Sequence, residues 1–143
     1  MKVYFDTSAF IKRYLLEQGS EQVPLILNKA SALALSALSL PEMISALTRL
    51  KHEKKLTTHL YQTIKNKIYD DLTNIILYPM TPQVITLTTE IIENNKVKTL
   101  DAIHIASASV WMCDYFVSAD KIQISVAKKI GLKIIDVSET TNN

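Results

Sequence analysis

The chain has 143 residues, a length typical of one domain. Its two glycines, one cysteine and three histidines exclude the glycine-rich loops that bind nucleotide phosphates, disulfide scaffolds and cysteine-rich zinc sites. The net charge of +2 is too small to indicate a nucleic-acid partner by itself. Catalytic or metal-binding groups must therefore be carboxylates, hydroxyls or amines.

Short apolar runs alternate with amphipathic stretches along the chain. The runs predict strands at residues 3–5, 33–36, 75–78, 115–118 and 133–136. The stretches predict helices at residues 8–17, 21–29, 41–54, 58–72, 82–94, 100–112 and 121–129. This alternation indicates an α/β fold whose mostly parallel sheet is covered by helices on both faces.

The ends and boundaries of the chain give further expectations. We assign residues 1–137 to a single domain and residues 138–143 to a polar tail, and we interpret Gly19 and Gly131 as helix stops. The longest weakly polar stretch, residues 30–40, is far shorter than the roughly 20 residues that span a bilayer. Asp6 also interrupts the start of the chain before a signal-type run can form. We therefore expect a cytoplasmic protein without a membrane partner.

Four acidic residues lie where a parallel sheet binds its ligands. Asp6 directly follows the first predicted strand and Asp120 closely follows the fourth, while Glu42 and Asp101 lie in the first turns of predicted helices. Ligands of open parallel sheets bind beyond the carboxyl ends of the strands, so we expect these carboxylates to converge. Converging carboxylates repel one another unless a cation lies between them, and Mg²⁺ or Mn²⁺ prefers such oxygen ligands.

Each acid also has a purely structural interpretation. Asp6 and Asp120 would serve as helix N-caps, and Asp101 would interact favourably with its helix dipole. Glu42 would complete a capping box with Ser39. Taken singly, these interpretations are about as good as a metal site. The expected convergence of all four acids favours the metal site.

Basic residues surround the predicted acidic site. Without the four acids, the 16 lysines and arginines outnumber the remaining acidic residues, a distribution that suits a phosphodiester substrate. Arg13 and Arg49 each follow one of the acids by about two helical turns and are candidate contacts to substrate phosphates. Pairing with nearby acids is the competing interpretation. His104, one turn after Asp101, is expected to be a packing or surface histidine.

Four short motifs contain the four acids. They are FDTSAF at residues 5–10, PE at 41–42, LDAIHIA at 100–106 and SADK at 118–121. In this order and spacing they resemble the motifs of PIN-domain ribonucleases. Together with the GLKII ending at residues 131–135, they look most like VapC-type toxins of bacterial and archaeal toxin–antitoxin pairs.

The resemblance implies a three-layer PIN-like fold around a parallel five-stranded sheet in the order 3-2-1-4-5. It also implies an endoribonuclease that depends on Mg²⁺ or Mn²⁺, an antitoxin protein as partner and a homodimer. It assigns catalysis to Asp6, Glu42, Asp101 and Asp120.

The resemblance further implies separate roles within this set. The metal ligands would be Asp6, Asp101 and Asp120, and Glu42 would be either an outer ligand or a base for the attacking water. The supporting hydroxyl groups would belong to Thr7, Ser8 and Ser118. For an RNA substrate, the spacing of Arg13 and Arg49 from the acids makes these two arginines the candidate contacts to its phosphates.

A sequence feature argues against each of three alternative functions. A phosphatase of the haloacid dehalogenase type needs a second acid two residues after Asp6, where Ser8 stands. A receiver domain needs a phosphorylatable aspartate after the third strand, where residues 79–81 carry none. A non-catalytic PIN-like module that binds RNA or protein is the remaining alternative, and the complete set of four acids argues against it.

Overall fold

The computed structural model describes residues 1–141. The strands are β1 (Lys2–Phe5), β2 (Ala32–Ser36), β3 (Ile76–Tyr78), β4 (Tyr115–Ser118) and β5 (Ile134–Asp136). The helices are α1 (Thr7–Phe10), the short 3-10 helix η1 (Ile11–Arg13), α2 (Gln22–Lys29), α3 (Ser39–His52), α4 (Thr58–Leu72), α5 (Pro82–Asn94), α6 (Thr99–Trp111) and α7 (Lys121–Lys129). Strands and helices therefore alternate as the hydrophobic pattern predicts. Among these helices, no apolar segment is long enough to cross a lipid bilayer.

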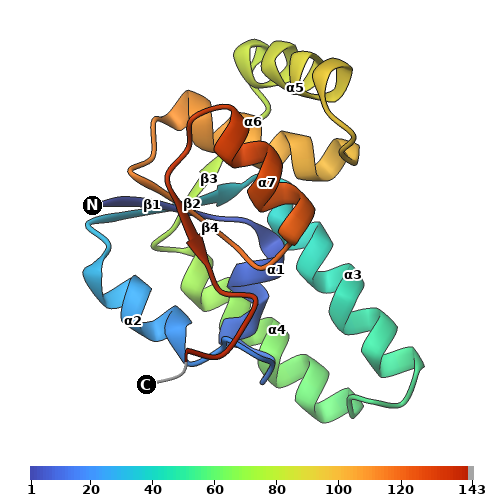
Figure 1. Ribbon diagram of the computed structural model, residues 1–143. Helices are drawn as coiled ribbons and strands as arrows, with labels where there is room; N and C mark the ends of the chain where they lie inside the picture. The colour runs from blue at the N-terminus through green and yellow to red at the C-terminus, as the bar shows by residue number, and fades with distance from the viewer. Residues whose placement is uncertain (142–143) are drawn as a thin grey trace.

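The strands of the described chain form a five-stranded sheet in the order β3-β2-β1-β4-β5 (Figure 1). All four neighbouring pairs are parallel. The α/β fold and the strand order implied by the family resemblance are both confirmed. Because β1 and β4 are neighbours, with Phe5 opposite Val117, the residues that follow these two strands emerge side by side at one edge.

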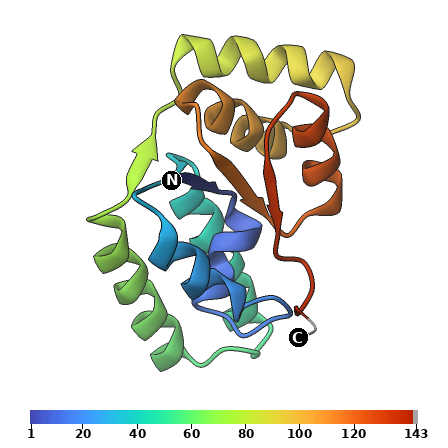
Figure 2. The ribbon, with the colours of Figure 1, turned by 60° about the vertical axis from the view of Figure 1, so that its left-hand side comes forward.

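Alternate residues of the central strand face two separate hydrophobic cores. Val3 and Phe5 pack into the core beneath α1, α2, α3 and α4, whereas Tyr4 packs into the core beneath α5, α6 and α7. Figure 2 shows the two groups of helices on opposite faces of the sheet. All three side chains are fully buried, as expected of a central strand covered on both faces.

The predicted helix at residues 8–17 is wrong in its length. The α-helix ends at Phe10 and tightens into η1, where the amides of Tyr14 and Leu15 both donate to the Ile11 carbonyl. The side chain of Lys12 then folds back and donates to the Gln18 carbonyl at 2.6 Å. These local hydrogen bonds take the place of the regular hydrogen bonds of an α-helix. The segment after Phe10 therefore folds into a compact turn and not into a longer helix.

Gly131 follows α7 with a left-handed φ of +93°, as expected of a residue just past a helix. Gly19, at φ +82°, lies instead in the turn before α2, so its interpretation as a helix stop is wrong. Its α-carbon approaches the Val137 backbone so closely that a Cβ would collide with the carbonyl oxygen.

The described part of the polar tail packs near this turn. Gln22 Nε2 donates to the Glu139 carbonyl at 2.6 Å, and the Thr141 amide donates to Glu21 at 3.1 Å. Residues 138–141 are thereby connected to the start of α2. Residues 142–143 of the predicted tail lie outside the described residues.

We expect Gly19→Ala to destabilise the fold more than Gly131→Ala. Both substitutions place an L residue at positive φ, which costs about 1 kcal/mol, or about 2–4 °C in the unfolding midpoint of a domain of this size. A Cβ at Gly131 meets nothing within 4 Å, so only the Gly19 variant adds a collision with Val137. Thermal unfolding followed by circular dichroism measures the difference. Equal losses for the two variants would contradict it.

Candidate active site

Two of the predicted acids lie just beyond the carboxyl ends of β1 and β4. Asp6 is the N-cap of α1, where it accepts from the Ala9 amide, and Asp120 is the N-cap of α7, where it accepts from the Gln123 amide. Glu42 and Asp101 lie in the first turns of α3 and α6. The capping interpretation of Asp6 and Asp120 thus holds for their backbone contacts, and it leaves both carboxylates at the same edge of the sheet.

Asp6 is fully buried and surrounded by hydrogen-bond donors. Ser118 Oγ donates to it at 2.6 Å, Ser8 Oγ lies within 2.8–2.9 Å of both carboxylate oxygens, and the Ala9 amide donates at 2.8 Å. Burial raises the pKa of Asp6, while the nearby His104 and these donors oppose the rise. The hydroxyl groups of Ser8 and Ser118 therefore hold a carboxylate that would otherwise be unfavourable in the protein interior.

Asp101 and Asp120 line one pocket of about 310 Å³ together with Lys96, Lys98 and Ile122. Burial raises the pKa of Asp101, and the negative charge of Asp120 raises it further; Asp6 and Glu42 add smaller contributions of the same sign. Burial and repulsion from the neighbouring acids therefore both disfavour the charged form of Asp101.

Glu42 contacts side chains from two other elements. Its Oε1 accepts from Thr7 Oγ1 at 2.9 Å and lies 2.7 Å from His104 Nε2. The predicted capping box is wrong, because α3 already begins at Ser39 and its N-cap, Leu38, has no side-chain hydrogen bond. The side chain of Glu42 thus extends across the edge of the sheet toward α6.

His104 was missed as a site residue by sequence reasoning. Residues 102–108 of α6 are all buried, and His104 itself is only 2% exposed. A polar ring on such a helix needs hydrogen-bond partners, and it has them in Glu42, Thr7 and Tyr4. The available signal was a single histidine inside a mostly apolar helix, one turn after Asp101.

The two candidate arginines have different surroundings. Arg13 Nε donates to Asp71 at 2.9 Å, and Tyr14 donates to the same carboxylate oxygen at 2.7 Å. The expected shared face of Arg13 and Asp6 is wrong because α1 ends before Arg13.

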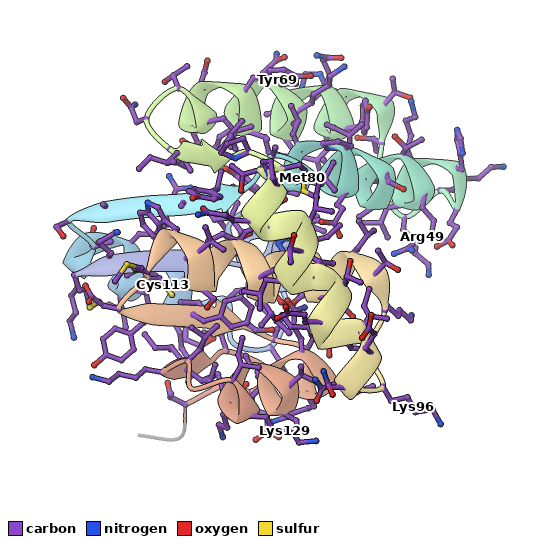
Figure 3. The ribbon with its side chains drawn as sticks, turned by 90° about the horizontal axis from the view of Figure 1, so that it is seen from above. Arg49, Tyr69, Met80, Lys96, Cys113 and Lys129 are labelled. Atoms are coloured by element: carbon purple, nitrogen blue, oxygen red, sulfur yellow. The ribbon has the colours of Figure 1, made fainter. Side chains whose placement is uncertain are left out.

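Arg49 lies where the spacing predicts. It is exposed and lines a pocket of about 410 Å³ with Glu42 and Leu100. Figure 3 shows Arg49 and Lys96 projecting from the same side of the molecule, from α3 and from the segment after α5. Basic side chains thus lie beside two pockets that the acids line.

Within residues 1–141, no group of three or more His, Cys, Asp or Glu side chains is arranged to hold a metal ion. Each acid instead has a protein partner. Asp6 accepts from two serines, Glu42 from Thr7, Asp101 from Gln123 and Asp120 from a helix amide. The donor chemistry nevertheless fits a hard cation, because all four groups are carboxylates whose repulsion a positive charge would relieve.

A family model described as the PIN domain matches residues 3–129. The chain belongs to the PIN domain family. This confirms the resemblance drawn from the four motifs. Comparison by sequence with curated proteins gave no match.

Solved structures of low sequence identity have the same fold. FitAcB from Neisseria gonorrhoeae is 15% identical, with a TM-score of 0.73 over 95% of this chain and 98% of that chain. A toxin–antitoxin complex from Klebsiella pneumoniae is 13% identical, with a TM-score of 0.70 over 96% and 98%. Mycobacterium tuberculosis VapC20, described as a sarcin–ricin loop cleaving toxin, is 13% identical, with a TM-score of 0.64 over 86% and 93%. At these identities the likeness shows the PIN fold alone.

The burial of Asp101 and its repulsion by the neighbouring acids predict that Asp101→Asn stabilises the protein at pH 7.5. The pKa of Asp101 is raised in the folded state, so its charged form opposes folding increasingly as the pH rises through the folded-state value. In EDTA we expect an unfolding midpoint about 2 °C higher than that of the wild type. The gain should disappear below about pH 3, where the carboxyl is protonated in both states.

Asp71→Asn is a control of opposite sign. Burial alone would raise the pKa of Asp71, but the hydrogen bonds from Arg13 and Tyr14 outweigh it and lower the pKa. The stability that Asp71 contributes is present above its unfolded-state pKa and is lost as the pH falls, so this variant should be less stable than the wild type at pH 7.5. A lower midpoint for Asp101→Asn at pH 7.5 would contradict the repulsion.

Proposed function

We propose that this PIN-domain protein is a metal-dependent endoribonuclease and the toxin of a type II toxin–antitoxin pair. The observation that carries the proposal is the set of four carboxylates at the carboxyl edge of the sheet, one directly after β1 and one two residues after the adjacent strand β4. The likeness to VapC20, a toxin described as cleaving the sarcin–ricin loop, supports the same class of activity for this chain.

Asp6, Asp101 and Asp120 would hold Mg²⁺ or Mn²⁺. Bound there, the ion would lower the pKa of a water and neutralise charge that develops on the phosphate. Burial and then repulsion from Asp120 raise the pKa of Asp101, and a bound cation would offset both by attracting the carboxylates. Ser8 and Ser118 keep the Asp6 carboxylate oriented, and Gln123 Nε2 donates to Asp101 at 3.3 Å.

Exposed basic side chains would bind the RNA backbone on both sides of the acids. Arg49 borders the pocket that Glu42 lines, and Lys96 and Lys98 border the pocket that Asp101 and Asp120 line. Arg13 has no part in this proposal, because its guanidinium pairs with Asp71.

An antitoxin protein would bind over the acidic edge and block it, and the toxin would form a homodimer in the cytoplasm. The structures of toxin–antitoxin complexes with the same fold support the antitoxin. The activity must therefore be measured on protein that is free of antitoxin. Light scattering on that protein measures whether it is a dimer.

We expect the purified protein to cleave RNA with Mg²⁺ or Mn²⁺ and to stop when EDTA is added. Asp101→Asn should lower the cleavage rate on the order of 10²-fold or more through the loss of a metal ligand. Because the same substitution is expected to stabilise the fold in EDTA, its lost activity would not reflect unfolding.

Asp6→Asn is a second variant, checked for folding by circular dichroism. Cleavage that survives both EDTA and Asp101→Asn would contradict the metal site, whereas RNA binding without cleavage would identify a non-catalytic module.

Arg49→Gln should weaken RNA binding three- to tenfold and reduce the slope of log affinity against log salt by about 0.7, the value for one contact to single-stranded phosphate. Fluorescence anisotropy with labelled RNA and the Asp101→Asn protein measures both effects. Arg13→Gln is the matched control, because it removes the same charge at a site tied to Asp71. Equal weakening by the two substitutions would contradict a specific role for Arg49.

A further inference from the structure

A chain of hydrogen bonds connects the protein interior to Glu42. Tyr4, in the middle of β1, is fully buried, and its hydroxyl lies 3.2 Å from Nδ1 of His104. On the opposite side of the ring, Nε2 lies 2.7 Å from Glu42 Oε1 and 3.3 Å from Thr7 Oγ1. One imidazole ring therefore joins the central strand, α6, α1 and α3.

The donor and acceptor properties of these groups constrain where the protons lie. A carboxylate oxygen only accepts, so the hydrogen between the ring and Glu42 belongs to Nε2 of His104. A neutral ring protonated at Nε2 has a lone pair on Nδ1, which must then accept from the Tyr4 hydroxyl. A tyrosine hydroxyl has an ordinary pKa of about 10, so at neutral pH Tyr4 carries the proton that this arrangement requires.

We propose that His104 is a positioning residue that holds Glu42 as an oriented proton acceptor, and that Tyr4 selects the Nε2–H tautomer of the ring. The proposal rests on the proposed ribonuclease function and assigns Glu42 to the attacking water instead of the metal. Thr7 and His104 both engage Oε1, which fixes the plane of the carboxylate. Within residues 1–141 no side chain or backbone amide donates to Oε2, the oxygen left for the water.

The partners of Glu42 also explain why it is separate from the metal ligands. Its side chain is 23% exposed and lines the pocket that contains Arg49 and Leu100, whereas Asp101 and Asp120 line the neighbouring pocket. Glu42 is also held by a buried ring on α6, the helix that carries Asp101.

Nitrogen NMR tests the tautomer directly and needs neither metal nor RNA. In ¹⁵N-labelled protein at neutral pH we expect His104 to show a protonated Nε2 and an unprotonated Nδ1. His104→Gln identifies its signals, because His52 and His59 are both exposed. Tyr4→Phe removes the donor to Nδ1 and should shift the ring toward a mixture of tautomers. A proton on Nδ1 in the wild type, alone or on both nitrogens, would overturn the assignment.

Kinetics test the positioning role. His104→Leu should lower kcat by about tenfold or more with little change in KM, and His104→Gln should recover most of the loss, because its amide can still donate to Glu42. In a double-mutant cycle, His104→Leu should add almost nothing to Glu42→Gln, since both act through one carboxylate. Additive losses, or no rescue by glutamine, would show a merely structural role. Unfolding midpoints of all variants confirm that each is folded at the assay temperature.

Magnesium binding separates the two roles of the acids. By isothermal titration calorimetry, Glu42→Gln and His104→Leu should keep the wild-type Mg²⁺ affinity within about twofold, whereas Asp101→Asn should lose at least tenfold. Equal losses for Glu42→Gln and Asp101→Asn would make Glu42 a metal ligand and overturn the proposal. A wild-type protein that cleaves no RNA would contradict the ribonuclease function alone, because the tautomer measurement does not depend on cleavage.

Discussion

The geometry of the site depends on the burial of one carboxylate, that of Asp6. An unpaired charge in the protein interior costs several kcal/mol, so donors must surround it. Ser118 Oγ donates to Asp6 and accepts from the Asp120 amide at 3.0 Å, while Ser8 Oγ donates to Asp6 and accepts from the Ala119 amide at 3.1 Å. Through these two serines, Asp6 is connected to the backbone of the turn that leads from β4 into α7. These hydrogen bonds also fix the position of Asp120 in that turn.

The strand order makes this arrangement possible. Parallel pairing places Phe5 beside Val117, and the Asp6 amide continues the ladder with a hydrogen bond to the Val117 carbonyl at 3.0 Å. A residue immediately after β1 then faces residues immediately after β4, although they are more than 100 positions apart in the sequence. The PIN fold thus brings its acids together through backbone register, and the serines then compensate the charge of Asp6.

Sequence reasoning predicts what depends on periodicity and fails where a side chain has both local and long-range hydrogen-bond partners to choose from. Four helices or strands, including α4 at Thr58–Leu72 and β4 at Tyr115–Ser118, match their predicted bounds, because their apolar patterns are packed in the cores. The predicted contact between Glu42 and the Ser39 amide is local, whereas the observed contacts to Thr7 and His104 join residues far apart in the chain. No spacing rule distinguishes these choices until the topology is known. The same limit explains why the spacing places Arg49 correctly but not Arg13. Residues two helical turns apart share a face along α3, whereas α1 is only a single turn long.

Helix α6 is packed in the protein interior and carries two residues of the candidate site. Its residues 102–108 are buried, packed between the sheet and α5, so the helix cannot rotate without disrupting the core that Tyr4 shares. Asp101 lies at its exposed end and His104 one turn further in, on the side facing Glu42. Side chains on a packed helix are held more closely than side chains on a loop, and closely held groups are what positioning in catalysis requires. The protein therefore places the Asp101 carboxylate and the His104 ring, which contacts Glu42, on the same rigid element. Loss of core packing beneath α6 would then disturb both together, even where the substituted residue touches neither.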